Sequence, residues 1–343
     1  MKLRLTHLSP LRFAWQQWQS PYTWRLGLAT AMSGWLRGYS SEQVVLLDLG
    51  RRSTRCPREL FRYRITLGTN RDVWPILHDK LLFDSFMRGR LPVIPLLGVF
   101  QAGRLSAVDF GLEQGALFDR LGTGERLVVK PLRGGGGQEV AFVAADSSGY
   151  RINGRRHDRH GLQAWFAALN YHGVYPYIEQ HPALAALYPA TVNTLRLLTL
   201  TDDDGEPVIA SVRLRIGSAA SCPVDNFERG GLVCRVDPQQ GVVKEAIVRT
   251  ANHGVARCDH HPQSGTEITG LRIPYWNELR TELLAFLARN RAFDMVGWDV
   301  LIGSEGYQLI EGNHNPGLLT TCLFDDPHEG ALLGRFLQRK GLG

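Results

Sequence analysis

The sequence predicts an α+β protein, and three stretches of the chain carry that prediction. Two short apolar runs flank Ser304-Glu305-Gly306, which is typical of a three-residue loop in a β-hairpin. Residues 192–200 alternate polar and apolar side chains, as a half-buried strand does. Residues 275–290 instead repeat leucine at helical spacing, so one face of that helix would meet a core. Strands and a long helix are thus predicted side by side.

Length and composition limit the class of protein that this sequence can be. The 343 residues, 44% hydrophobic and 21% charged, suffice for two domains or for one large domain with an extension. The five cysteines form no close pair, which argues against a disulfide framework or a zinc knuckle and favours a reducing compartment. No apolar run reaches the length of a membrane-spanning helix, and the N-terminus lacks the apolar core of a secretory signal. We therefore expect a globular, cytoplasmic protein.

Positive charge is concentrated at the start of the chain. Residues 1–70 hold eleven Lys or Arg against three acidic residues, a balance of +8, so the net charge of +6 leaves −2 for the remainder. This segment also holds Trp15, Trp18, Trp24 and Trp35, half of the eight tryptophans. Basic residues interleaved with tryptophan suit a membrane surface or an anionic glycan. The alternative, which the sequence favours, is a helical extension packed on the main domain by its tryptophans.

The first half of the chain is expected to be helical and then extended. The expected helices are residues 11–37, interrupted at Pro21, a further helix starting near Ser41, and residues 71–88, which contain Lys80. Residues 91–100 are expected to be extended, because the prolines at positions 92 and 95 do not fit inside a helix.

A glycine-rich turn joins two expected strands, residues 127–131 and 139–144. Its glycines are Gly134, Gly135, Gly136 and Gly137. Four successive glycines let a backbone approach a ligand closely, and their N–H groups can cradle phosphate oxygens. Lys130, at the end of the first strand, adds a cation at the same place. The alternative is a turn that only connects two strands.

The second half of the chain continues the mixture of strands and helices. The expected elements are a helix at 162–170, strands at 173–180, 207–216 and 232–236, a loop at 225–231 and a closing helix at 330–339. Arg213 and Arg215 share one face of their strand, where two adjacent cations favour an anionic partner such as phosphate or carboxylate. A solvated sheet face is the other reading.

The hairpin near the C-terminus is the best candidate for a metal site. If Gly303 pairs with Tyr307, counting back along both strands sets Asp299 opposite Glu311, and Asn313 projects on the same side. Buried carboxylates need a partner, and oxygen ligands favour magnesium held together with nucleotide phosphates. A polar strand end facing water is the alternative.

Taken in order, these stretches resemble the ATP-grasp superfamily. The similarity rests on Lys80, Lys130-Pro131 with the glycine turn, "EQHPALAALYPATVNTLRLLT", "RLRIGSAASCPVDNFERGG", Gly297-Trp298-Asp299 and Glu311-Gly312-Asn313, and it is greatest to the sugar-transfer-associated ATP-grasp branch. It covers roughly residues 75–335. The resemblance implies an ATP-grasp fold of two α+β lobes clasping ATP: residues 75–179 with the glycine-rich lid, and residues 180–343 with the magnesium site. Residues 1–74 would form a basic, Trp-rich, mainly helical extension.

The resemblance also implies roles for single residues, each at the position that matches a family motif. Nucleotide-binding positions would be Lys80, Lys130, Gly134, Gly135, Gly136, Gly137, Tyr177, Ile178, Glu179 and Asn193. Magnesium ligands would be Asp299, Glu311 and Asn313. Arg196, Arg213, Arg215 and Asn226 would serve catalysis, with Arg213 and Asn226 on the acyl-phosphate side.

The reaction implied by the resemblance joins a carboxylate to an amine through an acyl phosphate, with ATP and Mg²⁺. The substrates would be glycan- or lipid-linked, in modification of a polysaccharide or peptide, and the basic segment could touch the inner face of a membrane. Two alternatives stay open at this point: a kinase acting on a sugar or peptide hydroxyl, with His314 as its base, and a non-catalytic nucleotide- or glycan-binding protein. No nucleic-acid partner is expected.

Overall fold

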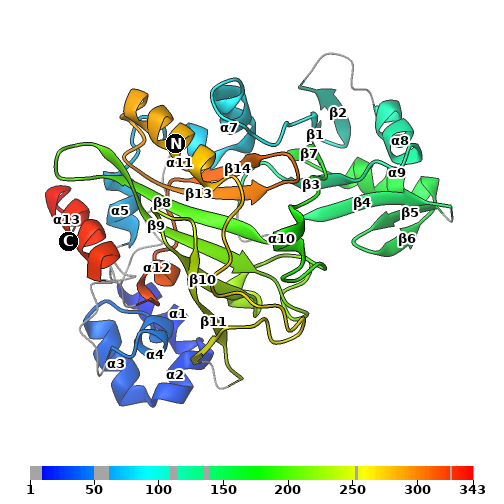
Figure 1. Cartoon of the computed structure of the whole chain (residues 1–343). Coiled ribbons are helices and arrows are strands. Elements are labelled where there is room, and N and C mark those ends of the chain that lie inside the picture. The colour runs from blue at the N-terminus through cyan, green and yellow to red at the C-terminus, as the bar shows by residue number, and fades with distance from the viewer. Residues whose placement is uncertain are drawn as a thin grey trace.

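The computed structural model describes residues 10–49, 62–108, 114–134, 139–147, 149–251, 254–324 and 327–342. It contains two seven-stranded sheets, and every pairing between their strands is antiparallel. The sheets lie at opposite ends of the molecule with helices packed on both (Figure 1). The predicted α+β class is therefore confirmed.

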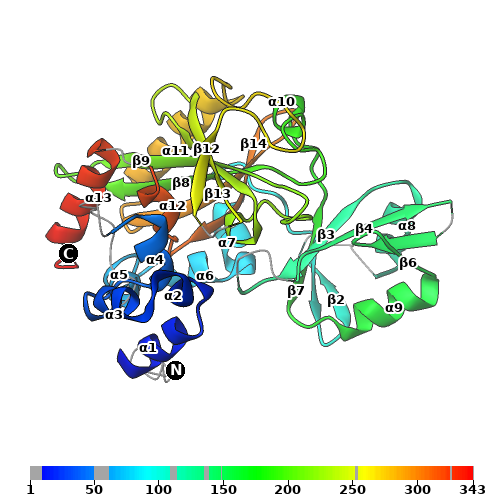
Figure 2. The same ribbon diagram turned by 90° about the horizontal axis from the view of Figure 1, so that it is seen from below.

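The first sheet is formed by the middle of the chain and has the order β2-β1-β7-β3-β4-β5-β6. Figure 2 shows it on the right, with two helices on one of its faces. Leu127, Val129 and Val174 point towards these helices and pack with Phe118 and Phe166. The elements are β1 (Gly98–Gln101), β2 (Arg104–Ala107), α8 (Gln114–Gly122), β3 (Leu127–Pro131), β4 (Ala141–Asp146), β5 (Gly149–Ile152), β6 (Arg155–His157), α9 (Arg159–Ala168) and β7 (His172–Pro176).

The second sheet is larger and has the order β12-β11-β10-β9-β8-β13-β14. Its central strands are long and almost wholly buried, because both of its faces are covered. The strands are β8 (Thr194–Thr201), β9 (Pro207–Ile216), β10 (Leu232–Val236), β11 (Val243–Arg249), β12 (Val255–Cys258), β13 (Met295–Ile302) and β14 (Tyr307–Asn313).

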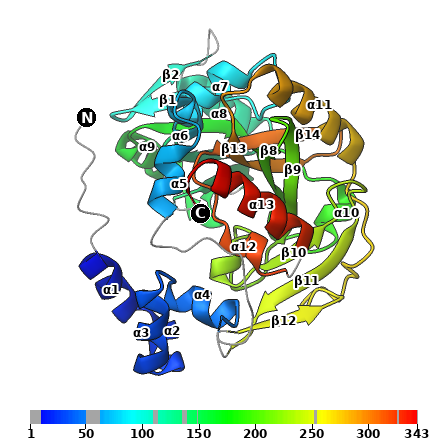
Figure 3. The ribbon, with the colours of Figure 1, turned by 90° about the vertical axis from the view of Figure 1, so that its left-hand side faces the viewer.

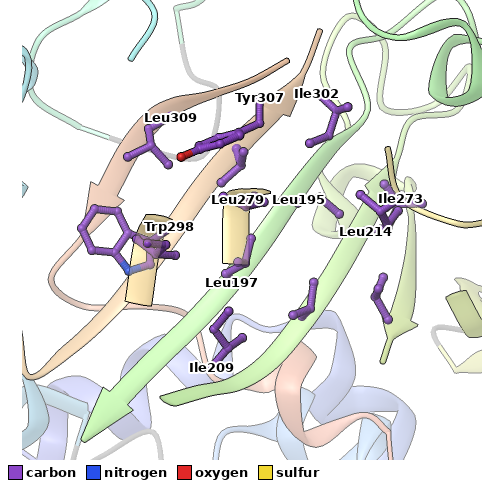
Figure 4. Packing of buried hydrophobic residues seen from close by; sticks show 14 of the residues in the cluster. Leu195, Leu197, Ile209, Leu214, Ile273, Leu279, Trp298, Ile302, Tyr307 and Leu309 are labelled. Atoms are coloured by element: carbon purple, nitrogen blue, oxygen red, sulfur yellow. The ribbon is translucent and has the colours of Figure 1, made fainter. Parts of the chain in front are cut away.

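Different helices cover the two faces of the second sheet. On one face, α11 (Trp276–Arg289) packs its leucines against Leu195, Leu197 and Trp298, together with α6 (Trp74–His78) and α7 (Lys80–Met87) (Figure 4). On the opposite face, α13 (Pro327–Arg339) packs against Leu198 and Leu200 and crosses in front of β8 and β9 (Figure 3). The short helix α12 (Leu319–Cys322) also touches β9.

Short helices form the N-terminal part, as the sequence predicts. They are α1 (Pro10–Trp18), α2 (Pro21–Leu26), α3 (Leu28–Leu36), α4 (Ser41–Leu46) and α5 (Arg62–Gly68). The Ser40 side chain and Gln43 cap each other's backbone N–H groups at the start of α4, which fixes where that helix begins. Within the described part of the chain, no helix combines the length and apolar character that crossing a membrane requires.

Three of the four N-terminal tryptophans do not attach these helices to the body, so the packing alternative favoured by the sequence is wrong for them. The fourth, Trp35, is partly buried and donates to the Ser41 hydroxyl within the N-terminal part. Trp15, Trp18 and Trp24 are 63%, 41% and 60% exposed. The attachment is made instead by α4, where Val44 and Leu47 form a buried cluster together with Leu319, Cys322 and Leu323 of the α12 region. The aromatic side chains are therefore left on the outer surface.

Two predicted elements differ from the structure by more than a few residues at their ends. The single helix expected at 71–88 is two helices, because Asp79 leaves the helical conformation and its carboxylate accepts the N–H groups of Leu81 and Leu82, which starts α7. The strand expected at 173–180 ends at Pro176, and a single bridge then joins Gln180 to Gly303 of the second sheet. Segment 177–179 thus connects the two sheets.

The expected lobe boundaries at residues 75 and 180 stay predictions. The first and second sheets lie on either side of position 180, as expected. However, Leu77, Phe83 and Met87 belong to the apolar cluster of the second sheet, although they precede every strand of the first sheet.

Candidate functional site

A row of charged side chains crosses the second sheet on the face opposite to Trp298. Register pairs Glu311 with Asp299, Asp299 with Arg196, and Arg196 with Arg213. Directly opposed residues project on the same side of a sheet, so these four side chains come from four adjacent strands onto one surface.

The predicted pairing of Asp299 with Glu311 is confirmed, but the reasoning behind it was wrong by one residue. Tyr307 pairs with Ile302 rather than Gly303, and an irregularity between Asp299 and Val300 restores the expected partner. An extra residue on β14 therefore lies between Leu309, which packs in the core, and Glu311, which faces the charged row. Without that bulge, alternation would turn Glu311 towards the core.

Asp299 is held by two arginines. Arg196 donates to both carboxylate oxygens, with its Nη2 2.9 Å from Oδ2, and the Nη2 atom of Arg215 lies 3.3 Å from the same oxygen. Burial opposes ionisation, but Arg196 and Arg215 hold the pKa of Asp299 well below its usual range. Asp299 is therefore a carboxylate at neutral pH.

Arg215 links this pair to a second carboxylate, Asp225. Its Nε is 3.6 Å from an oxygen of Asp225, and the Thr194 hydroxyl accepts hydrogen bonds from the same guanidinium. Thr194 in turn donates to Asp225 through both its N–H and its hydroxyl. Burial raises the pKa of Asp225 above its usual value, although Arg215 opposes the change.

Lys80 bridges the second sheet and the glycine turn. Its Nζ lies 3.0 Å from an oxygen of Glu311 and donates to the carbonyl of Gly134 at 3.0 Å. The lysine is placed by its neighbour Asp79, whose carboxylate caps α7 and also accepts from Arg133 at 2.8 Å and Tyr171 at 2.7 Å. Of the predicted glycines, Gly134 is therefore at the site, whereas Gly135, Gly136 and Gly137 lie outside the described residues.

Lys130 approaches from the first sheet. It is only 9% exposed, and its ammonium lies 4.4 Å from the centre of the Tyr175 ring. Burial, together with the nearby Lys80, lowers the pKa of Lys130 to about 8, against the opposing effect of Glu311 and Asp299. At neutral pH the Lys130 side chain is therefore still protonated. Because it is buried, its ammonium group is less hydrated than that of an exposed lysine.

These groups line a cavity of about 500 Å³ between the two sheets, a size typical of small-molecule sites. Its apolar wall comes from the first sheet and the connecting segment. Its charged wall comes from the second sheet. The first wall includes Val128, Lys130, Phe142, Tyr177 and Ile178, and the second includes Arg196, Arg215, Asp299, Glu311 and Asn313.

The connecting segment supplies a stacked pair at the apolar end. The Arg126 guanidinium lies 3.8 Å from the centre of the Tyr177 ring and forms an ion pair with Glu179. Tyr177 and Ile178 line the cavity. The Glu179 side chain is 70% exposed, so its predicted nucleotide contact would require the release of Arg126.

The structure does not bring Asn193 to the cavity. Its side chain is fully buried and donates to the carbonyls of Leu184 and Tyr188, while its oxygen accepts from Gly217 N–H. These bonds hold the loop before β8 against the end of β9. Its predicted part in binding a nucleotide stays a prediction.

Arg213 lies in the charged row, but its guanidinium is turned towards α13. It forms a buried ion pair with Glu329, with Nη1 3.1 Å from Oε1, and donates to the carbonyls of Thr320 and Thr321. Arg213 and Glu329 are only 1% and 3% exposed. The geometry favours a structural part for Arg213 in joining β9 to the α12–α13 region.

Asn226 lines the cavity together with Phe227 and Arg249. We call the part of the cavity that these three residues line its far end. Its side chain accepts from Glu228 N–H and so caps a 3-10 turn, η3 (Phe227–Arg229). Arg249 lies 4.6 Å from the Phe227 ring, and its terminal nitrogens bind Glu42 and Tyr22 of the N-terminal helices. Arg249 thus connects the N-terminal part to the cavity wall, as does Leu319, which lines the cavity and packs with Val44 and Leu47.

Several site residues escaped the sequence reasoning. Asp79, Arg126 and Arg249 are separated from most of their partners by long stretches of chain. Asp225 lies inside one of the family motifs, but the sequence assigned it no role. Asp79 carried one usable signal: an aspartate shortly before an apolar run, here two residues before Leu81, is a common helix N-cap.

The donor set of Asp299, Glu311 and Asn313 fits magnesium. The two carboxylates face each other on paired strands, and the side-chain NH2 of Asn313 donates to Glu311 at 3.3 Å, which places the Asn313 amide beside them. Among the described residues, no three His, Cys, Asp or Glu side chains group as metal ligands. Two carboxylates with an amide oxygen are nonetheless sufficient protein ligands for Mg²⁺, which takes its remaining ligands from water and phosphate.

His314 follows Asn313 in the chain and packs against helix α6. Its ring packs edge to face against Trp74 and His78, at 5.7 and 5.5 Å. Burial, with His78 nearby, lowers the pKa of His314 to about 4. It lines a second cavity of about 220 Å³, which shares Lys80 and Glu311 with the first.

Comparison with known proteins gives one matching family and several similar solved structures. Residues 62–327 match the model of the family described as sugar-transfer associated ATP-grasp. A search of curated proteins gives no match. Solved structures with a similar fold include N5-carboxyaminoimidazole synthetase from Staphylococcus aureus, at 10% identity and a TM-score of 0.37, over 71% of this chain and 45% of that one.

Two further structures are an L-amino acid ligase from Bacillus licheniformis and a D-alanine–D-alanine ligase from Bacillus anthracis. The first has 11% identity and a TM-score of 0.40, over 79% of this chain and 49% of that one. The second has 12% identity and a TM-score of 0.38, over 90% of this chain and 76% of that one. This chain spans about half the length of the synthetase and of the L-amino acid ligase. Because the family model covers most of the sequence, the chain belongs to the sugar-transfer-associated ATP-grasp family.

Proposed function

We propose that this protein is an ADP-forming ligase that joins a carboxylate to an amine through an acyl phosphate. The observation that supports it best is the set of four cations around the two opposed carboxylates. Lys80, Lys130, Arg196 and Arg215 all line the cavity with Asp299 and Glu311. Their charges sum to an excess of positive charge, which suits a polyphosphate that also brings a divalent cation.

ATP would lie across the cavity, from its apolar to its charged wall. The adenine would enter between Val128, Phe142 and the Tyr177–Ile178 segment, where aliphatic and aromatic side chains offer stacking surface. The phosphates would reach Lys80 and Lys130, and Gly134 with the glycines that follow it would close over them. Mg²⁺ held by Asp299, Glu311 and Asn313 would neutralise phosphate charge in this position.

The first step would transfer the γ-phosphoryl group. A carboxylate oxygen of the substrate forms a bond to the γ-phosphorus, the bond to the ADP oxygen breaks, and ADP leaves as an anion. Lys130 and Lys80 stabilise the charge on the transferred phosphoryl oxygens. Because Lys130 is largely buried, its attraction to these oxygens is weakly screened.

The second step would use the far end of the cavity. The amine attacks the acyl carbon and gives a tetrahedral intermediate. The bond from this carbon to the phosphate oxygen then breaks, phosphate leaves, and the nitrogen loses one proton to water. Arg215, between Asp225 and Asp299, is the cation best placed to stabilise the oxyanion of the tetrahedral intermediate. Asn226, Phe227 and Arg249 would contact the substrates there.

The family and the basic N-terminal part support a substrate that belongs to glycan biosynthesis. We propose a glycan- or lipid-linked carboxylate or amine, in the modification of a cell-surface polysaccharide or peptide. The protein would act in the cytoplasm, at the inner face of the membrane.

The reaction is tested with pure protein, Mg²⁺, ATP and pools of carboxylates and amines. ADP and free phosphate should appear together and only when both kinds of substrate are present. With a carboxylate alone, added hydroxylamine should trap the acyl phosphate as a hydroxamate. AMP and pyrophosphate as products would contradict the proposal.

A kinase would form ADP and a phosphorylated hydroxyl without free phosphate, so the same assay separates the two reactions. The structure offers little support for His314 as the base of a kinase. Its ring packs edge to face against Trp74 and His78, and it lines the second cavity rather than the one that holds Arg215.

A further inference from the structure

The N-terminal helices carry an exposed apolar surface. Eight large hydrophobic side chains are exposed in the described part of the chain, and six of them belong to residues 15–36. We call these six side chains the Trp face. They are Trp15 (63% exposed), Trp18 (41%), Trp24 (60%), Leu28 (40%), Met32 (47%) and Leu36 (88%).

The Trp face lies on the outside of the molecule. Helices α1, α2 and α3 protrude at the lower edge of the molecule, away from the first sheet (Figures 1 and 3). The rings of Trp18 and Trp24 meet edge to face at 4.9 Å, so α1 and α2 present them as one surface. Exposed apolar side chains are common when scattered, but a cluster of this kind marks a contact surface.

The charge around this surface is positive. Residues 1–70 carry a balance of +8. The acidic Glu42 is turned towards the body, where it lies 2.5 Å from Arg249. Within the described residues, Arg25 and Arg37 form no ion pair with an acidic side chain. These two arginines are therefore free to meet an external anion.

Tryptophan beside arginine and lysine suits one kind of partner. At a membrane surface, the indole rings occupy the headgroup level while basic side chains meet anionic lipids. A second copy of this chain fits less well, because a symmetric contact through this face would bring two strongly positive segments together.

We propose that the Trp face docks this protein on an anionic lipid surface. The docking goes beyond the proposed reaction and does not depend on it. It would also orient the cavity, since Tyr22 of α2 and Glu42 of α4 both hold Arg249, which lines the far end. A substrate anchored in the same membrane would then approach at that end.

The test measures sedimentation of the full chain with vesicles, in the absence of ATP. One set of vesicles is phosphatidylcholine alone, and the other includes phosphatidylglycerol. The variant is Trp15→Gln/Trp24→Gln/Leu36→Gln, which changes only exposed side chains. The matched control is Leu67→Gln/Leu82→Gln, which removes the two exposed leucines outside the Trp face. Thermal unfolding of all three proteins checks that each is folded.

Wild type and the control should bind the anionic vesicles equally, and the triple variant should bind them on the order of tenfold more weakly. Binding of the wild type should weaken between about 0.1 M and 1 M salt, because screening shortens the reach of the basic groups. Equal vesicle binding by the folded triple variant would overturn the proposal. So would a wild-type dimer that ignores vesicles and becomes monomeric in the triple variant, which would assign the face to a second copy.

Discussion

The two faces of the second sheet are built from the same strands and do different things. On one face, Leu195, Leu197 and Trp298 join the main apolar cluster beneath α11 (Figure 4). On the other, Arg196 and Asp299, their immediate neighbours in sequence, form the charged wall of the cavity. Because side chains of a strand alternate, one stretch of eight residues supplies both the core and the site.

Adjacent residues of one strand therefore serve different purposes: one stabilises the fold and the next lines the cavity. The first sheet repeats it on a smaller scale: Leu127 and Val129 pack under α8 and α9, while Val128 and Lys130 line the cavity. Replacing a residue on the apolar face should change the free energy of unfolding, and replacing one on the charged face should change turnover. Arg213 is the exception, since it lies on the charged face yet is buried against Glu329.

The largest expected effect is on the charged face. Glu311→Gln removes a proposed magnesium ligand and the partner of Lys80. Turnover of ATP should fall on the order of 10³-fold, equivalent to about 4 kcal/mol of transition-state stabilisation. The measurement is ADP formation under saturating ATP.

Glu305→Gln is the matched control, because Glu305 is an exposed carboxylate in the loop of the same hairpin. It should leave turnover unchanged. Wild-type turnover by Glu311→Gln at limiting Mg²⁺ would remove Glu311 from the site.

The apolar face gives the second prediction. Trp298 is fully buried among Phe83, Phe286 and Phe293. Trp298→Ala should lower the free energy of unfolding by about 3–5 kcal/mol. Denaturant titration measures the loss, and turnover per folded molecule at low temperature should stay close to that of the wild type.

The exposed Leu82→Ala is the control, and its free energy of unfolding should stay within about 0.5 kcal/mol of the wild type. A Trp298→Ala protein that is stable but inactive would mean that the two faces are not separable.

The third prediction tests whether Arg213, which lies on the charged face, stabilises the fold or takes part in catalysis. Arg213→Met leaves Glu329 buried without its cation, which should cost about 3 kcal/mol of stability. The double variant Arg213→Met/Glu329→Leu removes both charges and should recover most of that loss. If Arg213 is structural, the double variant also regains turnover. A stable but inactive double variant would restore the predicted catalytic role.

The smallest expected effect concerns pH. Lys130 is protonated below its pKa of about 8 and attracts phosphate, and it loses that charge above it. Nucleotide affinity should therefore be constant below this pH and fall by up to about tenfold per pH unit above it. Calorimetry across this range measures the slope. Lys130→Gln should bind more weakly at neutral pH and show no slope of its own, whereas an unchanged slope would assign the titration to another group.

Sequence reasoning was most accurate where local pattern decides the outcome. The bounds of β3, β9 and β10 are those predicted, since alternation and flanking turns define a strand locally. The division of β8 and β13 between core and site follows from the same alternation. The family resemblance is also a property of the sequence alone, and it is confirmed over residues 62–327.

Other features were decided only by the tertiary structure, because they join residues that are far apart in the chain. The bulge that turns Glu311 towards Asp299 depends on the register in which β13 and β14 pair. The pairing of Arg213 with Glu329 depends on where α13 packs, and exposure of the Trp face depends on α4 making the attachment instead. In a regular strand, alternation along the sequence sets the side that each residue takes, whereas the position of a bulge and the partner on each side are set by packing between distant segments.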